Sequence, residues 1–282
     1  MKFSMENAEL FIPDNTTEGQ ALARTTHMAI GAHQDDLEIM AFDGIVKCFQ
    51  QDDKWFAGVV VTDGRGSART GVYEKYSDDE MQLVRNKEQR KAAIVGEFSA
   101  QALLAFPSSA VKSGADQRPV QDLAALLSAA QPEVVYTHNL TDKHDTHIGV
   151  ALKTIAAIRS LPKEKRPKKV YGCEVWRDLD WMVDSDKVIF DCSKHESLQA
   201  ALVGVFDSQI AGGKRYDLAT MGRRKAHATY YASHATDEMT GLNFGVDLTP
   251  LIEDDNLDPA DYAQTLVQRF AQDVAQRISK LR

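Results

Sequence analysis

Short apolar runs alternate with segments of helical periodicity through most of this chain, and this alternation restricts its fold more than any other feature. Strands are expected at 27–32, 55–62, 102–106, 133–137, 169–175 and 187–190. Helices are expected at 37–50, 77–96, 120–130, 148–159, 198–206, 216–231 and from 259 onward. Alternating strands and helices predict an α/β protein with a right-handed, mostly parallel sheet. We expect a core over 1–207 and a mainly helical extension over 208–282 that packs on it, and we expect the two to form one structural domain.

A polar cluster follows the first firm strand directly. His33, Gln34, Asp35 and Asp36 come immediately after an apolar run that ends at Ala32. Unpaired charge is costly beside a buried parallel strand, so such a cluster needs a reason. Ligands of open α/β sheets bind beyond the carboxyl ends of the strands, where this cluster lies. The sequence therefore predicts a metal-binding turn between a strand and a helix.

Histidines gather again after the run at 133–137, in a segment that we expect to be a loop. His138, His144 and His147 lie there, although the whole chain has only 8 histidines. His33, Asp36 and His147 together provide two imidazoles and one carboxylate, which leaves one position of a tetrahedral zinc open for water. Asp35 is then the natural general base, and His144 is placed to hold or deliver a proton.

Three other interpretations stay open at this point. Asp35 and Asp36 alone suit the start of a helix, where the helix dipole favours anions, and single histidines are common in loops. Two histidines and a carboxylate also form the triad of non-haem Fe(II) oxygenases. A third alternative is a non-catalytic carbohydrate-binding protein. Zinc is the expected metal, with Fe²⁺ or another divalent ion as alternatives.

Two motifs in these segments resemble those of the PIG-L/LmbE-like family of zinc-dependent N-deacetylases, which act on N-acetylglucosamine derivatives and related amides. Residues 32–38 read AHQDDLE, where the family has AHPDDE or AHPDDxE, and residues 144–147 read HDTH, where it has HxDH or HxxH. The resemblance runs from about residue 28 to 152, and more loosely to 207. It implies a Rossmann-like three-layer sandwich and removal of an acetyl group from an N-acetyl amino sugar, a sugar conjugate or a related small amide through a zinc-bound water.

The resemblance also implies roles for individual residues. It assigns His33, Asp36 and His147 to zinc, Asp35 to the general base, and His144 to the tetrahedral intermediate. Arg85 then reaches polar groups of the substrate, unless it only belongs to a solvated charged helix face. Asp63 either contacts the substrate or forms a turn.

Two departures from the family pattern concern the first motif and the helix after it. Gln34 replaces the usual proline, which frees a backbone φ angle but removes no ligand. Phe42 and Asp43 stand where many members have small residues, which narrows or recharges the floor of the pocket. His195, His227 and His234 are expected at the surface or in helix packing, with entry of His234 into the site as the alternative. Core or interface packing is expected for the aromatic residues, with stacking on a sugar ring as the alternative: Trp176, Trp181, Tyr230 and Tyr231.

Composition limits the partners of the protein. The 282 residues are 43% hydrophobic, and 41 acidic against 33 basic residues give a net charge of −8, which argues against nucleic acid and anionic membranes. The 3 cysteines include no Cys-x-x-Cys pair, so we expect neither disulfides nor a thiolate zinc site. No secretory signal and no apolar run of about 20 residues is recognised. We expect a cytoplasmic enzyme with a small N-acetylated substrate, and a homo-oligomer stays open.

Overall fold

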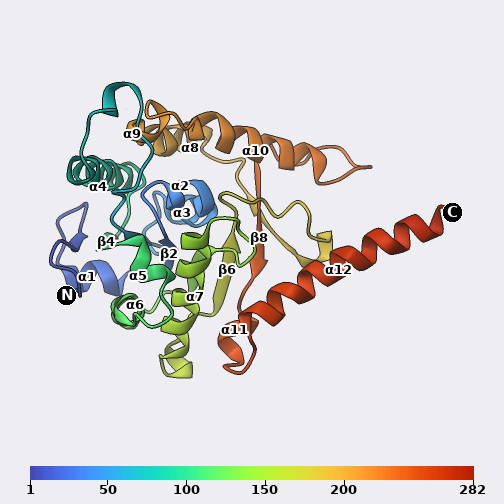
Figure 1. Ribbon diagram of the computed structural model, residues 1–282, viewed down its shortest axis with the longest axis horizontal. Coiled ribbons are helices and arrows are strands. Elements are labelled where there is room, and N and C mark those ends of the chain that lie inside the picture. Colours follow the sequence, from blue (N-terminus) through green and yellow to red (C-terminus); the bar gives the residue numbers. More distant parts are fainter.

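Eight strands form one mixed sheet in the computed structural model of the protein, which describes all residues from 1 to 282 (Figure 1). In chain order they are β1 (Glu9–Phe11), β2 (His27–Gly31), β3 (Phe56–Thr62), β4 (Ala100–Phe106), β5 (Val134–His138), β6 (Lys169–Cys173), β7 (Lys187–Asp191) and β8 (Leu242–Asp247). Their spatial order is β1-β4-β3-β2-β5-β6-β8-β7. The five strands from β4 to β6 in this order run parallel, whereas β1 and β8 are antiparallel to their neighbours. The predicted α/β class with a mostly parallel sheet is therefore confirmed.

Twelve α-helices surround the sheet. They are α1 (Glu18–Ala23), α2 (Asp36–Met40), α3 (Phe42–Cys48), α4 (Asp78–Val95), α5 (Ser108–Lys112), α6 (Arg118–Ala130), α7 (Asp145–Arg159), α8 (Glu196–Gly204), α9 (Asp207–Ile210), α10 (Tyr216–Tyr230), α11 (Pro250–Glu253) and α12 (Pro259–Lys280). Three short 3₁₀ turns lie at Gly71–Tyr73, Lys163–Lys165 and Asp184–Asp186. None of the helices is both long and apolar enough to cross a membrane.

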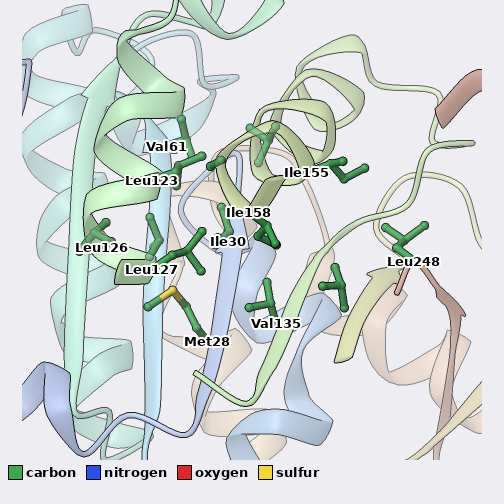
Figure 2. Close-up of a cluster of buried hydrophobic side chains, with 14 of the residues drawn as sticks. Met28, Ile30, Val61, Leu123, Leu126, Leu127, Val135, Ile155, Ile158 and Leu248 are labelled. Carbon is green, nitrogen blue, oxygen red and sulfur yellow. The ribbon is translucent and has the colours of Figure 1, made fainter. Parts of the chain in front are cut away.

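Side chains that alternate along the strands give the sheet two buried faces. Met28 and Ile30 of β2 lie in a cluster with α1, α5, α6, α7 and α11, part of which Figure 2 shows. Ala29, between them in the chain, belongs to a second cluster with α2, α3, α4 and α8. This period of two residues is expected for a strand that is covered on both sides. The protein therefore has three layers, helix, sheet and helix.

The order of the central strands determines where a ligand site forms. From β2 the chain moves outward to β3 and β4, and it then returns to place β5 on the other side of β2. The carboxyl ends of β2 and β5 thus flank the point at which the strand order reverses, which is the usual ligand site of open α/β sheets. The polar cluster that begins at His33 and the segment with three histidines start at these two strand ends.

The helix predicted at 37–50 is wrong as a single element, because α2 and α3 are separated at Ala41. Side chains from distant parts of the chain explain the break. Arg224 donates to the carbonyl oxygens of Glu38 and Ile39 at 3.0 and 3.1 Å, and Asn243 donates to that of Ile39 at 3.2 Å. These carbonyls are thereby satisfied without a continuous helix.

The C-terminal region, which is mainly helical as expected, also contributes a strand to the sheet. It contains β8, which lies between β6 and β7 in the main sheet. At Gly245, a Cβ atom would meet the ring of Phe190 at 2.4 Å, so the strand needs glycine there. Ser77 and Glu80 form a capping box at the start of α4, and the three cysteines are buried and free.

Candidate metal centre

The turn after β2 is held in shape by its own polar groups. The backbone N–H of His33 donates to Oδ2 of Asp36 at 2.7 Å, which closes the turn at the start of α2. Asp35 has a backbone φ of 95°, an unusual value for a residue other than glycine. Its N–H donates to Oε1 of Gln89 at 3.2 Å. Strained backbone of this kind is often found at functional sites, where the surrounding structure maintains it.

The three residues predicted as metal ligands converge in space. Nδ1 of His33 lies 3.2 Å from Nε2 of His147, although the residues are 114 positions apart. Oδ2 of Asp36 lies 3.4 Å from the same His33 atom and 3.5 Å from the same His147 atom. Ligands at about 2.0–2.1 Å from a tetrahedral zinc are about 3.4 Å from one another. The spacing of these three atoms therefore fits a tetrahedral metal ion.

His147 belongs to the first turn of α7, so the expectation that it lies in a loop is wrong. Its Nδ1 lies 3.2 Å from Oδ2 of Asp142. A histidine whose N–H at one ring nitrogen donates to a carboxylate presents the lone pair of the other nitrogen, here Nε2, to a metal. Burial would lower the pKa of His147, but Asp36 and Asp142 raise it.

His138 contributes to the centre in a way that the sequence analysis did not assign. It is fully buried at the end of β5, its ring stacks on that of His147 at 3.9 Å, and its Nε2 lies 3.3 Å from Oδ2 of Asp36. The backbone N–H of Ala32 donates to this Nε2 at 2.9 Å, so its lone pair is occupied. Burial, together with repulsion from His147, lowers the pKa of His138 to about 4, which keeps the ring neutral.

Donor atoms of the centre form two overlapping groups, one of His33, His144 and His147, the other of Asp36, His138 and His147. Because Nε2 of His138 already accepts from Ala32, the second group is the less suitable set of ligands. In the sequence, only the position of His138 at the end of a predicted strand indicated that it could belong to the site. His144 lies beside His147 with ring centroids 4.5 Å apart, and burial lowers the pKa of its half-buried ring.

Asp35 points away from these donor atoms and pairs with a buried arginine. Both terminal nitrogens of Arg85 lie 3.3 Å from Oδ2 of Asp35. Arg85 also donates to the backbone oxygen of Gln34. Burial raises the pKa of Asp35 to about 7, although the charge of Arg85 acts in the opposite direction. Burial would likewise raise the pKa of Asp36, but His147 and His138 hold it well below its usual range.

A cavity of about 320 Å³ opens beside this cluster. His33, Asp35, Asp36 and His144 line it on one side. Also in the lining are Asp63 and Arg85, which were predicted to bind substrate, and Lys112, Trp176, Lys214 and Tyr216. The cavity therefore brings together all the predicted site residues except His147, which lies buried behind His33.

Trp176 differs from the other aromatic residues for which packing was expected. It lines the cavity, with Nζ of Lys214 4.9 Å from its ring centroid. Trp181 packs against Phe270 instead, and Tyr230 is exposed to solvent. His195, His227 and His234 are absent from the cavity lining, as expected.

Asp63 stands where β3 ends and forms a turn. Its Oδ1 accepts the backbone N–H of Arg65 at 3.1 Å, and its Oδ2 lies 3.8 Å from Nε of the same arginine. Burial raises the pKa of this carboxyl group. Asp63 also lines the cavity.

Comparisons with known proteins agree with this description. No curated protein sequence matches the chain. Among solved structures, N,N'-diacetylchitobiose deacetylase from Pyrococcus horikoshii has a TM-score of 0.62 at 15% identity, covering 86% of this chain and 90% of its own. GalB, the 4-carboxy-2-hydroxymuconate hydratase from Pseudomonas putida KT2440, also has a TM-score of 0.62, at 16% identity over 79% of this chain and 96% of its own. A zinc-inhibited form of teicoplanin deacetylase Orf2 has a TM-score of 0.56 at 16% identity over 79% and 97% of the two chains.

These structural likenesses concern the fold alone. The family described as PIG-L, GlcNAc-PI de-N-acetylase, matches residues 28–158, from β2 to the end of α7. That segment carries both motifs of the metal centre and both strand ends at the reversal of the sheet order. The match to the PIG-L family, over residues 28–158, thus includes every candidate ligand of the metal centre.

Proposed function

We propose that this protein is a metal-dependent hydrolase that removes an acetyl group from an N-acetyl amino sugar, a sugar conjugate or a related small amide. The observation that carries the proposal is the triangle of donor atoms from His33, Asp36 and His147, with separations of 3.2–3.5 Å. The PIG-L match supports the reaction type. Zinc is the metal that we propose, because two imidazoles and a carboxylate are a common ligand set of catalytic zinc.

Each polar residue of the site has a distinct task in this proposal. A metal ion held by the three ligands would polarise the amide carbonyl group and acidify a water molecule. Asp35 accepts the proton of the attacking water, for which its raised pKa is suitable near neutral pH. Arg85 keeps Asp35 in position and favours its ionised form. His144 donates a hydrogen bond or a proton as charge develops on the substrate.

The cavity suits the remainder of an amino sugar. The indole face of Trp176 offers an apolar surface for a sugar ring, and Asp63 offers a carboxylate for hydroxyl groups. Lys112 and Lys214 line the same cavity and form no ion pair there. These groups select the substrate, whereas the residues around the metal perform the hydrolysis.

Detection of free amines across N-acetyl sugars, sugar conjugates and acetylated small amines tests the proposal. The metal-free protein receives zinc, and its activity is compared with those of Asp35→Asn and of a control, His234→Ala, whose histidine is exposed and outside the cavity. We expect chelation and Asp35→Asn to abolish amine release, with retained metal binding in Asp35→Asn. Zinc-independent release, or full activity of Asp35→Asn, would contradict the proposal.

The same preparations address the two other functions considered from the sequence. Oxygen consumption with ferrous iron and an oxo-acid cosubstrate would indicate the oxygenase instead. Saturable binding of a sugar without any turnover would indicate a binding protein. Both measurements use the wild-type protein with metal supplied, so a negative amine assay still assigns a function.

A further inference from the structure

Helix α12 and the residue that follows it carry a row of large apolar side chains that stay partly exposed to solvent. The exposed fractions are 48% for Val267, 38% for Phe270, 39% for Val274, 49% for Ile278 and 86% for Leu281. Figure 1 shows the helix extending away from the rest of the protein, and Leu266 is its only buried residue. Contiguous exposed apolar surface of this kind marks an interaction site.

The first part of α12 is firmly attached to the protein. The hydroxyl of Tyr262 donates to the backbone oxygen of Asp247 at 2.5 Å, and Nη1 of Arg269 lies 2.6 Å from Oδ1 of Asp186. The ring of Phe270 meets that of Trp181 with centroids 6.1 Å apart. The direction of the helix is thus fixed, and its free part begins after Phe270.

The apolar residues share one narrow face of the helix. At about 100° per residue, the five positions fall within an arc of about 80°. Their separations along the chain are 3, 4, 4 and 3 residues, which read the same in both directions. A helix of this pattern matches its own copy when the two run antiparallel.

Such a pairing has its two-fold axis at Val274. Val267 of one copy then lies opposite Leu281 of the other, and Phe270 lies opposite Ile278. Val274 meets its own counterpart. In an interface of two-fold symmetry the same patch serves both subunits, and here each large apolar residue faces another. We propose that α12 pairs with α12 of a second copy of this chain in this antiparallel register.

Charges beside the row favour the antiparallel arrangement. Asp273 and Arg277 lie on one flank and form an ion pair within the helix, with Nε and Oδ2 2.6 Å apart. In an antiparallel pair of helices like flanks meet, so Asp273 of each copy lies within a turn of Arg277 of the other. A parallel pair would place this flank against the uncharged one of Ala271 and Ala275. Only the antiparallel arrangement pairs these opposite charges between copies.

The mass of the protein in solution tests this proposal, measured by sedimentation velocity from about 1 to 100 µM. We expect a dimer for the wild type, and monomers for Val274→Asp and Val274→Lys, because each places two like charges together at the two-fold axis. An equimolar mixture of the two variants should restore the dimer. Leu218→Asp, a matched control at a position 60% exposed on α10, should remain dimeric.

Cross-linking tests the register independently of stability. The three native cysteines are buried, so Val274→Cys should give a disulfide-linked dimer on mild oxidation. Leu281→Cys alone should link poorly, but it should link to Val267→Cys in a mixture. A wild-type monomer at 100 µM, a dimer that survives Val274→Asp, or a mixture that stays monomeric would overturn the proposal. Binding of monomers to anionic phospholipid vesicles through α12 would overturn it as well.

Discussion

Replacing Arg85 by methionine isolates the charge on Asp35. The arginine is 2% exposed and places two nitrogens 3.3 Å from Oδ2 of the carboxylate. Methionine keeps an apolar stem of similar length but removes the only cation in contact with Asp35. The variant therefore leaves a buried carboxylate without its partner.

The size of the effect follows from this geometry. Two unit charges 3.3 Å apart attract each other by about 5 kcal/mol at an effective dielectric constant of 20. Breaking a buried pair by removing one member typically costs about 3–5 kcal/mol. We expect Arg85→Met to lower the free energy of unfolding by about 1.4 kcal/mol more at pH 8 than at pH 5, because Asp35, whose pKa is about 7, is ionised at pH 8 in the wild type, whereas in the variant it escapes the rest of the cost by binding a proton.

The pH dependence distinguishes the charge from simple loss of packing. Without Arg85 the pKa of folded Asp35 rises further above its unfolded value. Between these two pKa values the folded state binds more protons than the unfolded state, so its stability falls as pH rises. The cost of Arg85→Met should accordingly be smaller at pH 5 than at pH 8. Urea denaturation of the metal-free protein measures it at both values.

Asp35→Asn and the double variant complete the test. With no carboxylate present, Arg85→Met should show a cost that does not change with pH. Equal costs at pH 5 and pH 8 in the wild-type background, or a coupling energy below about 0.5 kcal/mol, would refute the reasoning. Kinetics of Arg85→Met separate this role from the one predicted from the sequence. Loss of a contact between Arg85 and substrate would raise KM, whereas loss of its support for Asp35 would lower kcat.

Three other changes test the surroundings of the site. Asp142→Asn should weaken metal binding about 10–100-fold in a chelator competition, since the orientation of His147 is lost, and unchanged affinity would contradict that role. Burial raises the pKa of Glu174 to about 7, so between about pH 4.5 and 7 this group makes the free energy of unfolding fall as pH rises. Glu174→Gln should remove about 3 kcal/mol of that fall in urea titrations, and the same pH dependence in variant and wild type would contradict this role of Glu174. Gly64→Ala should lower the free energy of unfolding by about 1–3 kcal/mol, because φ is +72° and the new Cβ would lie 2.4 Å from Oε1 of Gln34; a thermal shift below about 1 °C would contradict this strain.

Apolar runs and polar motifs in the sequence predicted most of the sheet and the convergence of His33, Asp36 and His147. The strand ends after β2 and β5 were identified because apolar runs stop abruptly at polar residues. The break at Ala41 was missed because its cause is Arg224, far along the chain, and helical periodicity continues across it. Strand β8 was missed because Asn243 and Gly245 interrupt a short apolar run. What the sequence left undetermined depends on contacts between remote residues.

The bonds from Arg224 and Asn243 to the end of α2 bear on how the protein is made. The segment that matches the PIG-L family ends at residue 158, yet two donors that fix the helix of the metal-binding turn lie at 224 and 243. A nascent chain leaving the ribosome can pair its central strands well before these donors are synthesised. We therefore expect the turn that carries His33 and Asp36 to become rigid only after nearly the whole chain has emerged.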